Sequence, residues 1–130
     1  MMYRSSKSKY LNKKVEVDGH IFDSKKESRR YGQLKALEKA GLITDLQLQV
    51  PYELIPAQKE PDTIGSRGGK KPGKTIERAV IYRADFQYRD KDGKLVVEDV
   101  KGYRMAGAYN LFVIKRKLML WKYNIQVKEV

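Results

Sequence analysis

Cysteine is absent from this sequence, and histidine occurs once among its 130 residues. Without cysteine the chain can form no disulfide, no thiolate zinc site and no cysteine nucleophile. A single histidine excludes a metal site built from several histidines of one chain. Any bound metal must therefore rest on oxygen ligands, which favours Mg²⁺ or Mn²⁺.

Long apolar runs and a balance of charge are missing as well. No stretch approaches the roughly 18 apolar residues that span a bilayer, and the first residues, MMYRSSKSKY, lack the apolar segment of a signal peptide. Lysine and arginine total 28 against 16 aspartate and glutamate, which gives a formal net charge of +12. This excess predicts a polyanionic partner, with nucleic acid favoured over an anionic membrane surface. We expect a soluble, cytoplasmic protein.

The hydrophobic content, 41% of the residues, is enough for one domain of this length. We assign that domain to residues 15–130. Residues 1–14 contain no acid, and we interpret them as a flexible basic arm, with a solubilising tail as the equal alternative. The basic residues of this segment are Arg4, Lys7, Lys9, Lys13 and Lys14.

Local signals near the start of the domain predict a hairpin followed by a helix. Residues 14–22 alternate apolar and polar side chains around Asp18-Gly19, a strong hairpin turn signal. Ser24 with Glu27 three residues later forms the pattern of a capping box, and the helix should end at Gly41. Its buried stripe should include Tyr31, Leu34 and Leu37.

The middle of the chain is predicted to form strands separated by one long loop. Residues 46–52 (LQLQVPY) alternate as in a half-buried strand. Residues 57–75 are rich in glycine, proline and lysine and predict a mobile basic loop. Two further strands, 79–88 and 94–101, should form a hairpin through the turn at Asp92-Gly93.

The last segment predicts an amphipathic helix and a short terminal strand, IQVKEV. Its apolar residues at helical spacing are Leu111, Ile114, Leu118 and Trp121, with lysine and arginine around the other faces. The whole order predicts an α/β or α+β fold, in which helices pack against a central mixed sheet.

Carboxylates inside the most strand-like segments of a basic chain need an explanation. Asp99 and Lys101 should project from the same face of their strand, since side chains alternate. Asp85 lies on the partner strand of the hairpin, close enough along the chain for the two carboxylates to meet. Such a pair raises a pKa unless a cation lies between its members, so it suggests a metal site.

Asp85 followed by Asp99-Val100-Lys101 resembles the signature of the PD-(D/E)xK nuclease superfamily. The stretches FDSKKE, ADF and EDVKG also resemble small phage-encoded proteins assigned to that superfamily, over residues 15–130. Ala84 stands where the named pattern has proline. The resemblance is to the branch of phage Holliday-junction resolvases and transposon-end endonucleases.

This resemblance implies a restriction-endonuclease-like core and a Mg²⁺-dependent DNA endonuclease. In that branch a glutamate on the first helix joins the metal ligands, which implies Glu27, Asp85 and Asp99 here, with the Val100 carbonyl completing the shell. Lys101 would position the attacking water. The resemblance further implies a homodimer that acts on branched DNA in phage recombination or replication, within the host cytoplasm.

Basic residues outside the motif are candidate DNA contacts. They are Lys115 and Arg116 on the last helix, and Arg67, Lys70, Lys71 and Lys74 in the 57–75 loop, which we interpret as a flexible flap over the DNA backbone. Residues 68–75 (GGKKPGKT) also match the phosphate-binding pattern GxxxxGK[ST], so a nucleotide binder is an alternative. That chemistry needs a buried strand before the glycines and a helix after them, and neither is predicted.

Other interpretations of the acidic residues stay open from sequence alone. Glu27 can serve only as the capping partner of Ser24, and Asp99 with Lys101 can belong to a solvated strand face. A bulge would replace Asp99 by Glu98 as the ligand. A nucleic-acid-binding module without catalysis fits the charge and the nine tyrosines equally well.

Overall fold

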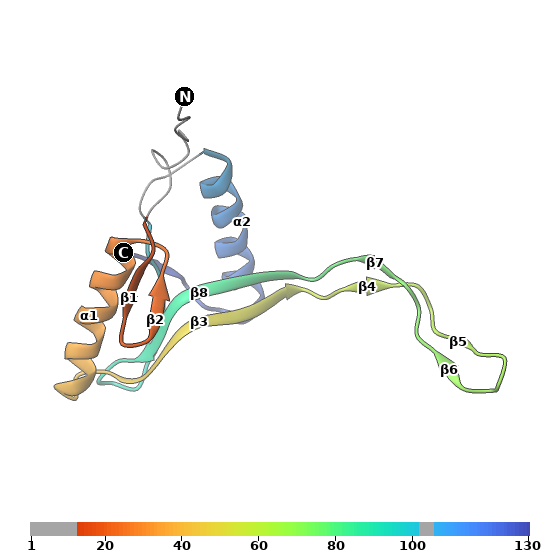
Figure 1. Ribbon diagram of the computed structural model, residues 1–130, viewed down its shortest axis with the longest axis horizontal. Coiled ribbons are helices and arrows are strands. Elements are labelled where there is room, and N and C mark those ends of the chain that lie inside the picture. The colour runs from red at the N-terminus through yellow and green to blue at the C-terminus, as the bar shows by residue number, and fades with distance from the viewer. Residues whose placement is uncertain (1–12, 102–105) are drawn as a thin grey trace, which may run out of the picture.

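A computed structural model describes residues 13–101 and 106–130 of the chain (Figure 1). Its centre is a mixed four-stranded sheet in the order β10-β9-β8-β3, in which β10 runs parallel to β9 and the other neighbours are antiparallel. The α+β class predicted from sequence is therefore confirmed. The sheet strands are β3 (Thr44–Ile55), β8 (Val80–Arg89), β9 (Leu95–Asp99) and β10 (Lys128–Glu129).

The remaining described elements are two helices and three short two-stranded ladders. The helices are α1 (Lys25–Lys39) and α2 (Ala106–Tyr123). The ladders pair β1 (Val15–Val17) with β2 (His20–Phe22), β4 (Gln58–Lys59) with β7 (Thr75–Glu77), and β5 (Thr63–Ile64) with β6 (Lys70–Lys71). The predicted basic arm, apart from Lys13 and Lys14, lies outside the described residues.

Helix α1 forms where the sequence signals place it. The Ser24 hydroxyl accepts a hydrogen bond from the backbone N–H of Glu27 (3.1 Å), which satisfies a free donor of the first turn. The helix ends before Gly41, whose φ of 78° favours glycine. Its buried residues are Glu27, Tyr31 and Leu34, so the predicted inward face is correct and carries a carboxylate.

Two hydrophobic cores lie on opposite faces of the sheet. On β9, Val97 packs with Phe112 of α2, whereas its neighbour Val96 packs with the core that holds Leu34 of α1. Because consecutive strand residues point to opposite faces, α1 and α2 cover the sheet from different sides. Each helix therefore presents its side chains to a different face of β9.

The strands β3 and β8 change which core their even-numbered side chains enter. Leu48 and Phe86 are paired and belong to the α1 core, while Tyr52 and Tyr82 are paired and belong to the α2 core. Alternate residues of an uninterrupted strand share one face, so this change requires a local break in the alternation. On β3 such a break lies at Gln49, whose φ of 53° is in the left-handed region.

The loop predicted over residues 57–75 is instead part of a two-stranded β-arm. We call residues 56–79 the arm; they continue β3 and β8 away from the rest of the molecule (Figure 1). Gln58 pairs with Glu77, and Ile64 pairs with Lys70. The sequence does not indicate these short strands because backbone hydrogen bonds between the two segments form the ribbon without the apolar alternation that usually indicates strands. The mobility of the segment stays a prediction.

Helix α2 buries a different face from the apolar stripe seen in the sequence. Phe112 and Met119 are its buried residues, whereas Leu111, Ile114 and Trp121 are exposed to 53%, 56% and 79%. Phe112, Met119 and, of the predicted stripe, Leu118 pack on the core, and the other three stripe residues are left on the outer surface. In the described ranges, neither helix combines the length and apolar character needed to cross a membrane.

Candidate active site

Three carboxylates predicted from sequence come from three different elements and act on one another electrostatically. Glu27 lies in the first turn of α1, Asp85 in β8, and Asp99 at the end of β9. Glu27 and Asp99 are almost fully buried, and Asp85 is half-buried. The alternative interpretation, in which Asp99 belongs to a solvated strand face, is therefore wrong. We call these residues, with Gln49 and Lys101, the carboxylate site.

Burial and neighbouring carboxylates raise the pKa of two acids of this site, Glu27 and Asp85. Burial, followed by the negative charges of Asp85, Asp23 and Asp99, raises the pKa of Glu27 from 4.5 to about 7. Burial and then the charge of Asp99 raise the pKa of Asp85 from 3.8 to about 6, although Val100 and Gln49 donate hydrogen bonds to it. When Glu27 and Asp85 are both ionised, the site therefore favours the binding of a cation.

Gln49 connects two of the three carboxylates, a role that the sequence does not reveal. Its side-chain amide donates to Glu27 Oε1 (3.2 Å) and to Asp85 Oδ1 (3.4 Å). Gln49 lies opposite Asp85, between the pairs Leu48–Phe86 and Val50–Ala84. The left-handed backbone at Gln49 thus coincides with the point where its amide reaches both acids.

Asp99 is held by groups from the sheet and by the motif lysine. Tyr82 donates its hydroxyl to Asp99 Oδ1 (3.1 Å), and the Lys101 ammonium forms an ion pair with the other carboxylate oxygen. Lys101 Nζ also lies 3.6 Å from the centre of the Phe112 ring, a cation–π distance. The expected neighbourhood of Asp99 and Lys101 is confirmed, with Tyr82 and Phe112 as additional members.

Backbone groups at and just after the end of β9 connect this strand to β8 and α1. The Val100 N–H donates to Asp85 Oδ2 (2.8 Å), which places the strand end directly on the β8 carboxylate. The Lys26 ammonium donates to the Lys101 carbonyl, so α1 contacts the motif from its first turn. The Val100 carbonyl as a metal ligand stays a prediction. Nothing in the sequence marks Lys26 as a neighbour of the motif.

Glu98, the alternative to Asp99, has a structural role on the opposite face. Arg30 of α1 donates to both of its oxygens (2.8 and 2.6 Å), and the Tyr88 hydroxyl donates to it as well. Burial raises the pKa of Glu98, but the hydrogen bonds from Arg30 and Tyr88 outweigh this and lower the pKa below its ordinary value. Asp99, and not Glu98, therefore stands beside Asp85.

A family model described as "Protein of unknown function (DUF1064)" matches residues 7–129. The chain belongs to this family. The DUF1064 match spans every residue of the carboxylate site and the whole arm. No curated protein and no solved structure matches the chain. Because the family description carries no activity, the chemistry of this DUF1064 protein has to be argued from its own residues.

The donor set of the DUF1064 site suits a hard divalent cation. Carboxylate oxygens from Glu27, Asp85 and Asp99 are the ligands that Mg²⁺ and Mn²⁺ prefer. Within residues 13–101 and 106–130, no group of three His, Cys, Asp or Glu side chains already stands in coordinating geometry. Gln49 donates hydrogen bonds to Glu27 and Asp85, and Lys101 forms an ion pair with Asp99. These two side chains therefore contact carboxylate oxygens that would otherwise bind a cation.

The basic residues predicted to contact DNA lie in two places. Lys115 donates to the Ile81 carbonyl (3.0 Å), and Arg116 contacts Glu129 (3.4 Å) and the Phe112 ring, so both are anchored on the sheet side of α2. The arm carries the others, Arg67, Lys70, Lys71 and Lys74. In this DUF1064 chain residues 68–75 include β6 and the start of β7, and the next element is the strand β8, not a helix. The geometry that a nucleotide-binding loop requires is therefore missing there.

Proposed function

We propose that the protein is a Mg²⁺-dependent DNA endonuclease that hydrolyses phosphodiester bonds. The observation that carries this proposal is the convergence of Glu27, Asp85 and Asp99, from three elements, with the Lys101 ammonium beside Asp99. Like charges gathered at one place destabilise a protein unless a cation or a function offsets them. Oxygen ligands and a neighbouring amine suit phosphoryl chemistry.

Each residue of the site has a distinct role in this proposal. Glu27, Asp85 and Asp99 would hold the ion, with the Val100 carbonyl as a further ligand. When bound, Mg²⁺ supplies Lewis acidity and lowers the pKa of a water molecule. Lys101, steadied over the Phe112 ring, would orient the attacking water and stabilise the negative charge that builds on the phosphate.

The charge distribution supports a nucleic-acid substrate. A net charge of +12 attracts a polyanion, and the excess continues along the arm to Arg67, Lys70 and Lys71. We extend the proposal to branched DNA of phage recombination or replication, because of the resemblance to junction resolvases. A homodimer is part of it, and the exposed stripe Leu111, Ile114 and Trp121 on α2 offers an apolar surface for a second copy.

The deciding experiment compares cleavage of supercoiled plasmid and of a synthetic four-way junction with Mg²⁺ or with EDTA. We expect cleavage with Mg²⁺ that is lost in Asp85→Asn, while DNA binding in EDTA is retained. Asp92→Asn, an exposed carboxylate in the β8–β9 turn, is the matched control and should cleave like the wild type. Cleavage that survives Asp85→Asn, or that needs no divalent ion, would refute the proposal.

A non-catalytic nucleic-acid-binding module is the second candidate. The ion pair between Lys101 and Asp99 favours it, because an acid already neutralised by the protein has less need of a metal. Such a module would bind both DNA substrates without cutting them in Mg²⁺ or Mn²⁺. Its affinity would fall gradually as surface lysines are neutralised and would not change in Asp85→Asn.

A further inference from the structure

Backbone hydrogen bonds join the two strands of the arm at several points along its length. Glu60 N–H donates to the Lys74 carbonyl (2.8 Å), and Gly65 N–H donates to the Gly69 carbonyl (2.6 Å), so backbone bonds continue between and beyond the two ladders. A Cβ placed on Gly73 would overlap the Glu60 carbonyl, so the strands meet there at a distance that only glycine permits. The arm therefore has a defined shape that a partner can recognise.

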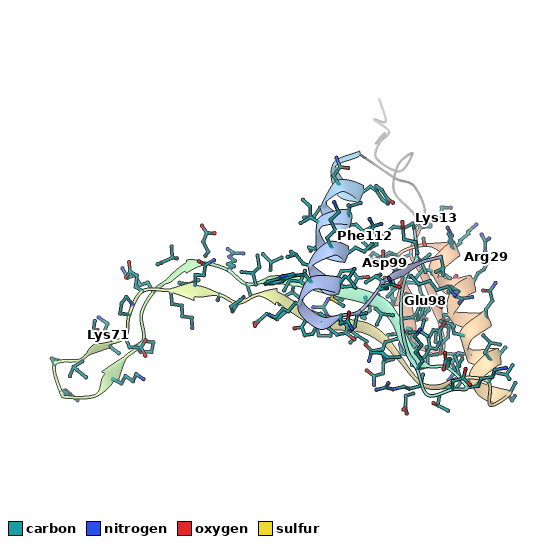
Figure 2. The ribbon with its side chains drawn as sticks, turned by 180° about the vertical axis from the view of Figure 1, so that it is seen from behind. Lys13, Arg29, Lys71, Glu98, Asp99 and Phe112 are labelled. Atoms are coloured by element: carbon teal, nitrogen blue, oxygen red, sulfur yellow. The ribbon has the colours of Figure 1, made fainter. Side chains whose placement is uncertain are left out.

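Positive charge is concentrated in the outer part of the arm. We call residues 63–74 the distal hairpin; it contains Arg67, Lys70, Lys71 and Lys74 and no acid. Three acids belong to the arm: Glu77 lies in β7, and Glu60 lies opposite Lys74. The third, Asp62, forms an ion pair with Lys70 (3.3 Å) and accepts a hydrogen bond from the Gly73 N–H (2.9 Å). Figure 2 shows Lys71 at the far end of the arm, well away from Asp99. The four basic side chains are all exposed.

The cations of the distal hairpin project from both of its faces. Lys70 and Lys71 are consecutive strand residues, so they point to opposite sides. Ile64, the partner of Lys70, is 73% exposed, and the ribbon has no core of its own. An isolated two-stranded ribbon is only marginally stable in water, which favours a partner that covers both faces. A flat anionic surface would use only one of them.

The major groove of B-form DNA meets these requirements. It is about 12 Å wide and admits a two-stranded β-ribbon, with phosphates along both walls and base edges on its floor. The major groove of A-form RNA is deep and narrow and would exclude the ribbon. We propose that the distal hairpin binds in the major groove of duplex DNA, an inference that rests on the DNA-directed function proposed above.

The length of the ribbon then restricts the substrate. At about 3.3 Å per strand residue, the turn at Gly68 lies up to about 55 Å along the chain from Asp85, which corresponds to about 16 base pairs at 3.4 Å each. The substrate class is therefore DNA with a long double-helical flank on one side of the cut. Ends and short duplexes would lose the arm contact.

Disulfide cross-linking tests the groove directly, because the chain has no cysteine of its own. Ser66→Cys, in the turn of the distal hairpin, is incubated in EDTA with a duplex of about 30 base pairs, longer than the estimated reach. One duplex carries a thiol tether on adenine N6 in the major groove, and another carries it on guanine N2 in the minor groove. Lys91→Cys, exposed in the β8–β9 turn, is the matched control.

We expect Ser66→Cys to couple with the major-groove tether at least about tenfold faster than Lys91→Cys, since binding raises the effective thiol concentration. Equal rates for the two variants, preferential coupling to the minor-groove tether, or equal coupling with an A-form RNA duplex would overturn the inference. Cross-linking in EDTA by a protein that cleaves neither plasmid nor junction in Mg²⁺ would refute the nuclease and leave the groove contact intact. Cleavage without cross-linking would do the reverse.

A binding measurement in EDTA provides an independent test. Arg67, Lys70, Lys71 and Lys74 are changed together to glutamine, and the control changes Lys39, Lys91, Lys94 and Lys128, which are exposed on the body. If all four distal residues contact phosphates, the slope of log K against log salt falls by up to about 3.6, at about 0.9 per contact. The control should lose less. Equal losses in the two variants would contradict a specific role of the arm.

Discussion

Gln49 lies opposite Asp85 where β3 and β8 change which core they face, and its amide donates to Asp85 (3.4 Å) as well as to Glu27 (3.2 Å). A left-handed backbone is costly for a residue other than glycine, asparagine or aspartate. Here the same residue interrupts the strand alternation and links two acids of the site. The strain at Gln49 therefore lies within the carboxylate site.

Gln49→Gly should separate the effect of the side-chain amide on cleavage from the effect of the backbone conformation on stability. Glycine adopts the φ of 53° without strain, so the free energy of unfolding should stay the same or rise. Loss of the amide should reduce Mg²⁺-dependent plasmid cleavage about 10- to 100-fold, as for groups that orient metal ligands. Single-turnover cleavage rates and urea unfolding measure the two effects.

Asp45→Gly is the control for Gln49→Gly, since Asp45 has a φ of 55° in the same strand. It should relieve a similar backbone strain and leave the cleavage rate unchanged. If Gln49→Gly cleaves at the wild-type rate, or if both variants lose activity equally, Gln49 does not position the acids.

Glu27→Gln should change the pH dependence of stability. The pKa of Glu27 rises from 4.5 to about 7, so the folded state holds this proton more tightly than the unfolded state. The resulting destabilisation is absent below about pH 4.5 and complete above about pH 7. After allowance for solvent screening, the variant should be more stable than the wild type by about 1–2 kcal/mol at pH 8 and equal to it near pH 4.5.

Urea unfolding in EDTA at the two pH values measures this difference. Glu16→Gln, an exposed glutamate in β1, should shift stability equally at both. If Glu27→Gln is less stable than the wild type at pH 8, the ionised Glu27 carboxylate stabilises the folded protein. That result would contradict the interpretation that the site is destabilised until a cation binds.

The sequence predicts this fold where local signals and periodicity agree. Ser24 and Glu27 mark the start of α1, and the inward face of Glu27, Tyr31 and Leu34 follows from the helical period. Asp99 and Lys101 share a strand face, which is why their neighbourhood could be expected. These features depend on residues close together in the chain, and such features are readable without tertiary information.

Features set by distant contacts could not be predicted in this way. The left-handed backbone at Gln49 occurs where β8 and α1 place two acids beside its side chain, and local sequence does not indicate that arrangement. On α2 the orientation is decided by Phe112 under Lys101 and by Met119 in the core, so the more regular stripe with Leu111 stays outside. The arm forms from polar segments whose pairing leaves no trace in hydrophobic periodicity.

Arg30→Ala should be strongly destabilising. Glu98 is fully buried and depends on both hydrogen bonds from Arg30 in addition to Tyr88. Removing one partner of a buried pair costs about 3–5 kcal/mol, because the remaining charge is left uncompensated. Since the pKa of Glu98 is lowered in the folded protein, this stabilisation is present above pH 4.5 and is lost as the pH falls.

The loss in Arg30→Ala should therefore be large at pH 7 and smaller at pH 4 in urea unfolding. Arg29→Ala, the exposed neighbour on α1, should have little effect at either pH. Equal effects of the two substitutions would show that the buried ion pair does not distinguish Arg30 from a surface residue.

Trp121→Lys should weaken self-association if α2 forms the proposed dimer interface. Trp121 is 79% exposed and lies on one side of α2 with Ile114. Burial of a large apolar side chain contributes about 1.5–3 kcal/mol, and in a two-fold dimer the change occurs twice, so the dissociation constant should rise about 100-fold or more. Sedimentation equilibrium of both proteins measures this constant.

Ile76→Lys, 63% exposed on the arm, adds the same charge as Trp121→Lys and should leave the dissociation constant unchanged. A wild-type protein that sediments as a monomer at the highest concentrations, or equal weakening by the two lysines, would remove the α2 stripe as the interface.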